Sequence, residues 1–465
     1  MKKRISFLPT VLLALLVAFG FVSCQKEELV SATPENSQSA NSKVPVDPGF
    51  AENDMVMYWN EKVSTVLVAP MPMPFRARLF AIMEIAVHDA LNSIKPKYQR
   101  YALTDVREPH ASPDAAVASA AYHVIIGLNQ QRLQPVGDWY NESLATIPDG
   151  ESKELGKALG KKAADAIIAL RANDGLGQVI FTSTIPADGD EPGEYRSTLP
   201  YQNPAIFIPP NKSIPNWGVV MKPFAVESND QFRPDGPYSV QSAEYAADFN
   251  EVKTKGARVG HTRTAEEEEI SVFWKDLTSH IWNRFARAMI SDHKLDAWKT
   301  ARVFALMHTS MKDGITAAIE SKYHFYTWRP ETAIRMAETD NNAATGSLEG
   351  WLPSLIDAPN AINHLFNFIT PPLPEYPSSF AAMSGAGAQA LKLVFGSDAA
   401  DVELTSAALP GVTRHYTSIL QASRDNAMGK VYAGWYFRKG VLDGENQGME
   451  VAEYIFNNHF GESED

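Results

Sequence analysis

Two basic side chains in the C-terminal third of the chain, Lys322 and Arg329, stand seven residues apart in the segment K-Y-H-F-Y-T-W-R-P. Seven residues make two turns of an α-helix, so the spacing predicts that both side chains point from one helix face. Arginine offers a planar fork of donors and lysine a compact charge, and together they suit a multiply charged oxyanion. A solvated basic surface would show the same spacing, so the neighbouring segments have to decide between the two interpretations.

A second segment, E-Y-P-S-S-F, places Ser378 and Ser379 at the expected start of a helix. A hydroxyl and the free N–H groups of a helix N-terminus can bind an anion, although Ser378 would also serve as an ordinary N-cap residue. A third segment, G-K-V-Y-A-G-W-Y-F-R, supplies another cation, Lys430. The predicted oxyanion pocket therefore contains Lys322, Arg329, Ser378, Ser379 and Lys430.

In order and spacing, the three segments resemble the motifs K-x6-R-P, P-S-G-H and S-R-x5-H of the vanadium-dependent haloperoxidase and type 2 phosphatidic acid phosphatase superfamily. Similar flanks extend the resemblance to about residues 50–455, and it is greatest to the soluble, secreted haloperoxidase-like subgroup. The resemblance implies vanadate as cofactor, with phosphate or another oxyanion as alternative ligands. Lys430 stands where the family has an arginine, which keeps the charge and loses the bidentate fork.

The resemblance also marks two departures at positions with catalytic roles in the family. Phe380 stands where the family has a histidine that acts on protons, and phenylalanine cannot donate, accept or titrate. Tyr436 stands where the family has the histidine that ligates vanadium or attacks phosphorus. An unactivated tyrosine is a poor nucleophile at neutral pH, and packing of this aromatic ring in a helical core is the more expected role.

Three hypotheses about function remain open from the sequence. The first is a divergent binding protein or pseudoenzyme that keeps the fold and part of the anion pocket. The second is an enzyme of altered chemistry, in which Lys322, Lys430 and Tyr436 do acid–base work on a small anionic substrate. The third is an active vanadium-dependent haloperoxidase or acid-phosphatase-like enzyme.

Other histidines are not expected to replace the two missing ones. His324, His364 and His415 lie near the motifs, and each is predicted to be an ordinary polar or surface residue. His88, followed by an aspartate on an apolar helix, is expected to make a buried hydrogen bond. No H-E-x-x-H spacing occurs, so no metal site is predicted, and the segment 384–387 is too weak a pattern for a nucleotide-binding loop.

Helical periodicity dominates the chain and predicts an all-α, helical-bundle domain. A capping box at Thr264 is expected to open a helix toward Trp274. No alternating segment is judged long enough to build a sheet, and the proline-rich segment 185–237 is expected to be a long irregular excursion. The expected helices cover residues 76–94, 114–130, 151–173, 295–326, 379–395 and 425–436, with Gly156 and Gly160 allowing close helix contact.

The N-terminus has the order of a lipoprotein signal: basic residues at positions 2–4, a short apolar run over 11–19 and then Cys24, the one cysteine of the chain. The apolar run is too short to cross a bilayer comfortably. We therefore predict a signal peptide over 1–23, lipidation of Cys24, a disordered tether over 24–48 and the helical domain over 49–460. The acidic residues after Cys24 resemble an export signal of surface lipoproteins, so we expect an exported outer-membrane lipoprotein exposed at the cell surface.

The composition and net charge of the chain limit the kinds of partner that it is expected to bind. A hydrophobic fraction of 45% with 21% charged residues is typical of a packed globular protein. The net charge of −13 disfavours nucleic acid, because binding to phosphate backbones needs a basic surface. We expect a small anionic ligand and contact with the membrane only through the lipid anchor, and the sequence leaves an oligomer open.

Overall fold

The computed structural model describes residues 54–66, 71–128, 133–179, 188–198, 214–355 and 370–463. All of them belong to one compact unit, Pro45–Asp465, which is separate from the unit Met1–Val44. The expected signal peptide, Cys24 and the tether lie outside the described residues. So does His364, together with parts of the proline-rich segment.

The first half of the described chain forms a helical bundle around α2, Met73–Ile94. Nearly every residue of α2 is buried, because α3 and α5 cover one side of it and α10 covers the other. Gly156 and Gly160 of α5 lie against the backbone of α3, where any side chain would collide, and this confirms their expected role. The other helices of this bundle are α1 Met55–Val66, α3 Pro113–Leu128, α4 Leu133–Ala145 and α5 Glu151–Leu170.

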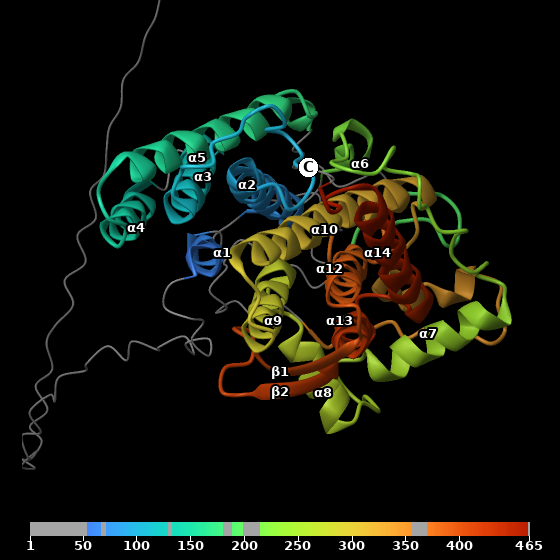
Figure 1. Ribbon diagram of the computed structural model, residues 1–465. Helices are drawn as coiled ribbons and strands as arrows, with labels where there is room; N and C mark the ends of the chain where they lie inside the picture. Colours follow the sequence, from blue (N-terminus) through green and yellow to red (C-terminus); the bar gives the residue numbers. More distant parts are fainter. Residues whose placement is uncertain are drawn as a thin grey trace, which may run out of the picture. The chain divides into compact units, whose positions relative to one another are not determined.

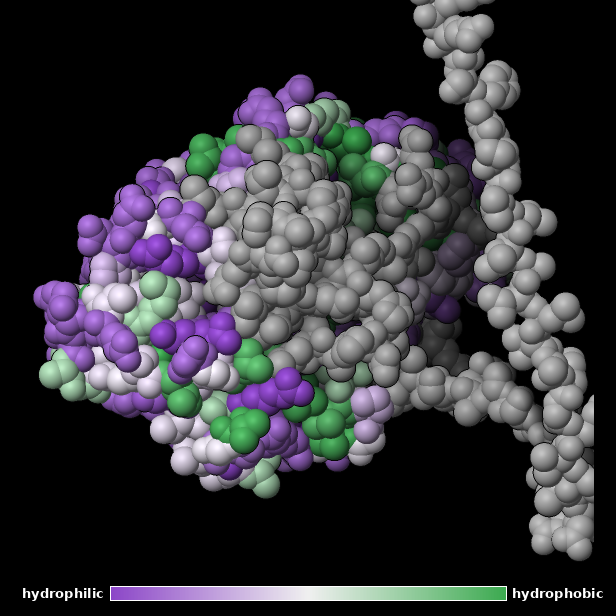
Figure 2. Space-filling model, turned by 180° about the vertical axis from the view of Figure 1, so that it is seen from behind, coloured by the Kyte–Doolittle hydropathy of each residue, from purple (hydrophilic) through white to green (hydrophobic). Residues whose placement is uncertain are grey.

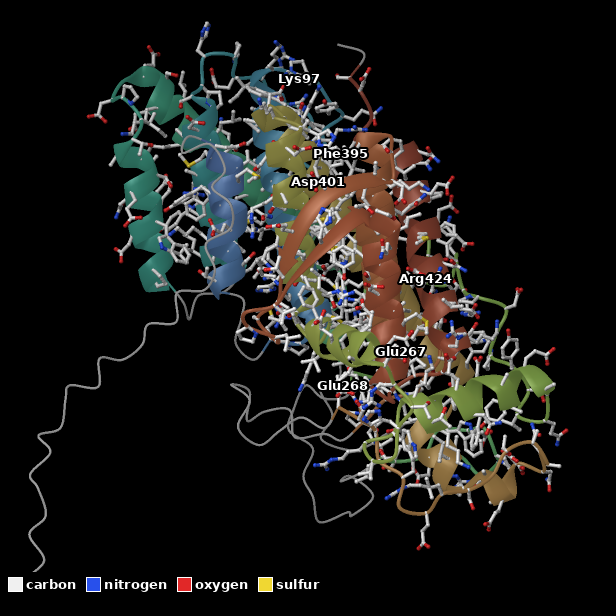
Figure 3. All side chains as sticks on the ribbon, turned by 90° about the horizontal axis from the view of Figure 1, so that it is seen from below. Lys97, Glu267, Glu268, Phe395, Asp401 and Arg424 are labelled. Atoms are coloured by element: carbon white, nitrogen blue, oxygen red, sulfur yellow. The ribbon has the colours of Figure 1, made fainter. Side chains whose placement is uncertain are left out.

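A run of shorter elements connects the two bundles. The capping box predicted at Thr264 is present and opens α8, which ends just before Trp274. In the described parts of the proline-rich segment the chain is irregular apart from one four-residue helix, α6. The elements are η2 Leu176–Gln178, α6 Trp217–Val220, α7 Ala243–Lys255, α8 Ala265–Phe273 and α9 Thr278–Asp292. Figure 3 labels Glu267 and Glu268 in the first turn of α8, which packs against α13, the helix that carries Arg424.

The second bundle is built on α10, which lies between the blue and green helices and the red helices in Figure 1. Helix α10 packs against α2 on one side and against α12 and α14 on the other. The elements are α10 Ala297–Phe325, α11 Pro330–Arg335, η3 Ala337–Thr339, α12 Ser379–Phe395, α13 Ile419–Tyr432 and α14 Arg438–Asn458. Among the described residues the fold is thus almost wholly helical, as predicted.

One expectation about secondary structure is wrong. Strands β1, Ala399–Thr405, and β2, Thr413–Ser418, form an antiparallel pair beside α9 and α13. The apolar residues Val402 and Leu404 alternate with acidic ones and point into the core. This alternation is a strand signal, but it is short enough to be overlooked beside the long helical periodicities.

Two clusters of buried apolar side chains hold the unit together. The larger joins both helical bundles through α2 and α10. The smaller lies between α7, α11 and the turn that follows α13, and it contains Trp328, Trp435 and Tyr436. Where Figure 2 is coloured, polar and apolar residues are interspersed on the surface. Among the described helices, none combines the length and the apolar character that crossing a bilayer would require.

Candidate functional site

Lys322 and Arg329 do meet, but not in the way that their spacing predicted. Helix α10 ends at Phe325, and Tyr326 has a left-handed backbone conformation with φ of 54°. Arg329 then lies at the N-cap of α11, so the two cations belong to different helices. The reversal of the chain at Tyr326, rather than a common helix face, turns the two side chains toward each other.

Both cations are fully buried and hydrogen-bonded to the backbone of one loop. Lys322 Nζ donates to the carbonyl oxygens of Pro374 at 3.1 Å and Glu375 at 2.6 Å. Arg329 donates from Nε to the Leu373 carbonyl at 2.7 Å and from Nη2 to the Pro374 carbonyl at 3.3 Å. The donors that could hold an oxyanion therefore hold the loop that leads into the second motif.

Tyr436 lies between these cations and the third motif. The helix expected over 425–436 ends at Tyr432, because Gly434 with φ of 81° starts a tight turn against the backbone of residues 256 and 353. The turn carries the ring of Tyr436 under Lys322 Nζ and the Arg329 guanidinium, whose distances to the ring centroid are 4.8 and 4.4 Å. Its hydroxyl lies 3.4 Å from both Lys322 Nζ and Arg329 Nη2 and accepts from them. A fully buried phenol thus occupies the position next to the two cations.

The second motif starts helix α12. Ser378 is the N-cap, with its hydroxyl accepting from the Ala381 N–H at 3.3 Å and its own N–H donating to the Gly440 carbonyl at 2.8 Å. Ser379 is the first helical residue and is also buried. Phe380 follows, and its ring lies edge-on to that of Tyr436 with the centroids 6.4 Å apart. The three motifs therefore converge through aromatic rings at their centre.

Lys430 lies on the other side of the aromatic pair. Its Nζ is 5.0 Å from the centroid of the Phe380 ring and donates to the Trp274 carbonyl at 2.5 Å. No contact of Lys430 with Lys322 or Arg329 is found among the described residues. Burial lowers the pKa of Lys430 to about 7, and the nearby charge of Lys275 acts in the same direction.

Glu375 belongs to this cluster, although the sequence interpretation gave it no role. Its Oε1 accepts from the Phe437 N–H at 3.0 Å, and its carboxylate interacts electrostatically with Lys322 and Arg329. Burial raises the pKa of Glu375 to about 7, although the charges of these two cations act to lower it. Burial, together with the Arg329 charge, holds the pKa of Lys322 well below its usual range. The sequence did contain a signal for this role. Glu375 stands in an apolar, proline-rich segment between two basic motifs, and a buried acid needs a charged or hydrogen-bonding partner.

Three of the four histidines considered in the sequence analysis lie as expected, and the fourth, His364, is outside the described residues. His324 is exposed on the last turn of α10, and His415 pairs at the surface with Asp401 at 2.7 Å. His88 is buried and hydrogen-bonds through Nε2 to the Gln99 carbonyl at 3.0 Å. The described residues contain no group of three histidine, cysteine or acidic side chains placed to hold a metal ion.

Comparison with known proteins supports the resemblance. Residues 302–461, which include all three motifs, match the family model for the second helical-bundle domain of vanadium chloroperoxidase. The chain is 22% identical over 413 residues to the vanadium chloroperoxidase of Curvularia inaequalis, and the match covers 73% of this chain. It spans 65% of the length of that relative.

The fold is similar to those of solved bacterial vanadium-dependent haloperoxidases. A structure described as the first bacterial vanadium-dependent iodoperoxidase aligns with a TM-score of 0.68 at 22% identity, over 88% of this chain and 96% of that one. An apo bacterial vanadium-dependent chloroperoxidase aligns with a TM-score of 0.67 at 15% identity, over 84% and 94%. Motif order, the family match over residues 302–461 and the shared fold all support the resemblance to the vanadium-dependent haloperoxidase and type 2 phosphatidic acid phosphatase superfamily.

Proposed function

We propose that this chain is a divergent member of the superfamily that no longer catalyses vanadate-dependent halide oxidation. The observation that carries the proposal is the Tyr436 hydroxyl, which accepts hydrogen bonds from Lys322 and Arg329 where the resemblance calls for an imidazole. The ring lies beside both cations, and their other hydrogen bonds to the described residues go to backbone carbonyls.

These residues do not fit a covalently held vanadate. Such a bond needs an imidazole nitrogen, and no histidine contacts the cluster among the described residues. Phe380 supplies no proton donor, and Ser378 uses its hydroxyl and its N–H inside the protein. What the cluster offers is a buried positive field, partly balanced by Glu375, and such a field supports weak, salt-sensitive binding of phosphate, vanadate or a related oxyanion.

The test is a halide oxidation assay with bromide or chloride, hydrogen peroxide and vanadate, run beside a phosphatase assay. The wild type is expected to show no detectable oxidation and little phosphatase turnover. The double variant Phe380→His, Tyr436→His serves as the matched comparison, since it restores both imidazoles. Vanadate-dependent oxidation by the wild type at rates above background would overturn the proposal, and activity gained only by the double variant would support it.

A second function, acid–base catalysis on a small anionic substrate, is favoured by the perturbed pKa values. The pKa values of Glu375 and Lys430 are shifted to about 7, and that of Lys322 is strongly lowered, so all three could exchange protons near neutral pH. A chromogenic phosphate ester is the first probe. Turnover with a bell-shaped pH profile that is lost in Lys322→Met would support this function, and the absence of turnover from pH 5 to 9 would exclude it for that substrate class.

The proposed setting is the cell surface. The N-terminal order of basic residues, apolar run and Cys24 supports export and lipidation, which would tether the helical domain to the outer membrane. In this setting the protein meets small ligands from outside the cell and does not need a partner protein to be retained there.

A further inference from the structure

A pocket of about 340 Å³ lies next to the motif cluster and shares one wall with it. The shared wall is Glu375, which faces Lys322 and Arg329 on one side and lines the pocket on the other. The remaining walls come from residues 192–193, from the segment before α7, from α7 itself, from the turn before α11 and from the start of α14. Neither Lys322 nor Arg329 lines this pocket.

Aromatic rings make up much of the pocket wall. The lining rings are Tyr238, Tyr245, Trp328, Tyr376 and Phe437. Tyr245 and Phe437 pack with their ring centroids 5.6 Å apart, and both are more than nine-tenths buried. The Tyr245 hydroxyl is buried beside the Trp328 indole and lacks a hydrogen-bond partner of good geometry. A buried hydroxyl of this kind is costly unless a ligand or water meets it.

Two carboxylates face the same space. Asp248 Oδ2 accepts from the Lys439 N–H at 2.7 Å, and Glu375 Oε1 accepts from the Phe437 N–H at 3.0 Å. The second oxygen of each carboxylate makes no hydrogen bond with the described residues. Each buried acid therefore presents an acceptor that is free to receive a hydrogen bond from a ligand.

The lysine in the wall does not cancel these charges. Lys439 Nζ pairs with Asp443 at 2.7 Å and lies 4.8 Å from the centroid of the Tyr238 ring. Its charge is thus balanced in part by an acid that does not itself line the pocket, and it also favours the ionised form of Asp248. The arrangement also shows that the Tyr238 ring already receives one ammonium group on its face.

We propose that this pocket binds a small organic cation, in which an ammonium group reaches Asp248 and Glu375 while an apolar or aromatic body packs against the Tyr238, Tyr245 and Phe437 rings. Free carboxylate oxygens require a ligand that donates hydrogen bonds, and electron-rich ring faces favour a positive charge. The volume suits a ligand with one ring and a short side chain. An anion would meet two carboxylates, so the pocket selects the charge opposite to that expected from the motif cluster behind it.

The experiment uses three probes of nearly equal shape that differ in charge: 2-phenylethylamine as its ammonium ion, 2-phenylethanol and phenylacetate. Their dissociation constants are measured by calorimetry with the full-length protein at about pH 8, above the pKa of about 7 of Glu375. The ammonium ion is expected to bind at least about tenfold more tightly than the alcohol, since a charge-assisted hydrogen bond typically contributes that much, and phenylacetate is expected to bind most weakly.

Variants of the two pocket carboxylates then test whether the ammonium probe binds in this pocket. Asp248→Asn keeps an oxygen for the Lys439 N–H, and Glu375→Gln keeps one for the Phe437 N–H, so both are expected to fold. Each should weaken binding of the ammonium probe about tenfold. The matched control is Glu251→Gln, a carboxylate one turn along α7 that pairs with Arg438 and does not line the pocket, and it should leave the affinity unchanged.

Tyr238→Ala gives a readout that does not depend on either buried acid. Tyr238 is 40% exposed, so the change is tolerated by the fold and should weaken binding by removing one ring face. Equal affinity for the alcohol and the ammonium ion, preference for phenylacetate, or no binding of any probe would each overturn the proposal. Because vanadate and phosphate binding is measured separately, failure here leaves the proposed function of the motif cluster intact.

Discussion

At the level of single residues, the central feature of the motif cluster is the phenol of Tyr436, which lies against two buried cations. Lys322 and Arg329 both lie over the Tyr436 ring and both reach its hydroxyl. The ring face and the hydroxyl of Tyr436 together balance part of the positive charge that a bound oxyanion would otherwise balance. Under the proposed function, Tyr436 therefore both fills the space beside the two cations and stands in place of the imidazole that the family's chemistry uses.

Truncating this residue is expected to reopen the space. Tyr436→Ala leaves the two cations facing a cavity, and a phosphate or vanadate ion that enters gains charge-assisted hydrogen bonds from both. We expect phosphate affinity, measured by calorimetry at low salt, to rise about tenfold or more over the wild type. The cost is a loss of about 3–5 kcal/mol of folding stability from the cavity, so thermal unfolding has to be checked first. Phosphate affinity at or below that of the wild type in a folded variant would contradict this account of Tyr436.

Lys430 predicts a pH dependence of stability. Its pKa in the folded protein is lowered from 10.5 to about 7 by burial, so between these values the unfolded chain binds more protons than the folded one. The free energy of unfolding contributed by this group therefore rises with pH across that window, by up to about 1.4 kcal/mol per pH unit, and is lost as the pH falls toward 7.

Lys430→Met removes this titration. The stability advantage of the variant over the wild type should be largest near pH 7 and should shrink steadily toward pH 10, as measured by urea unfolding at several pH values. Lys161→Met, which replaces a half-exposed lysine on α5, is the control and should give a difference that barely changes with pH. A flat difference for Lys430→Met as well would mean that its ammonium is not strained by burial.

At the level of elements, the second bundle depends on how closely α14 approaches α12. Gly440, Gly444 and Gly448 recur every four residues on α14. A side chain at Gly444 would meet the Ser378 backbone, and one at Gly440 would meet the Glu375 carboxylate. The glycine stripe therefore fixes the distance between α14 and the loop and helix start that carry the second motif.

Gly448→Ala tests this packing. Its methyl group would lie against the Ala382 carbonyl, with the Ala386 nitrogen at 2.8 Å, so the helices would have to separate. We expect a loss of about 1–3 kcal/mol in the free energy of unfolding. Gly137→Ala in α4, where nothing lies within 4 Å, is the matched control and should instead stabilise by up to about 1 kcal/mol through helix propensity. Similar values for the two variants would show that the α12–α14 contact is looser than described.

At the level of the whole molecule, one helical unit carries both the motif cluster and the acidic pocket, and its proposed anchor lies in the separate N-terminal segment. Cys24→Ala is expected to move the protein from the membrane fraction to the soluble fraction of cells, since a lipid chain is the proposed means of retention. Immunoblots of the two fractions measure this, with Ser23→Ala as a control that keeps the cysteine. A Cys24→Ala protein that stays with the membrane would show that another contact retains it.

The sequence by itself determined the fold class and most helix positions. Helical periodicity is a local pattern, since it depends on residues three and four positions apart. It can therefore be recognised without knowing how the helices pack. The boundaries of α12 and the capping box at Thr264 followed directly, because side chains near in sequence set them.

Only the tertiary structure decided what the cluster contains. Lys322 and Arg329 meet because the chain reverses at Tyr326, and Tyr436 reaches them because Gly434 ends α13 early. Glu375 becomes part of two sites at once because α14 comes close enough for its first residues to line the same pocket. The contacts of Tyr436 with Lys322 and Arg329 join residues more than 100 positions apart, and those of Glu375 join residues more than 50 apart. Burial then shifts the pKa values of Lys322 and Glu375, so neither spacing nor composition could have given the charge that each side of the cluster presents.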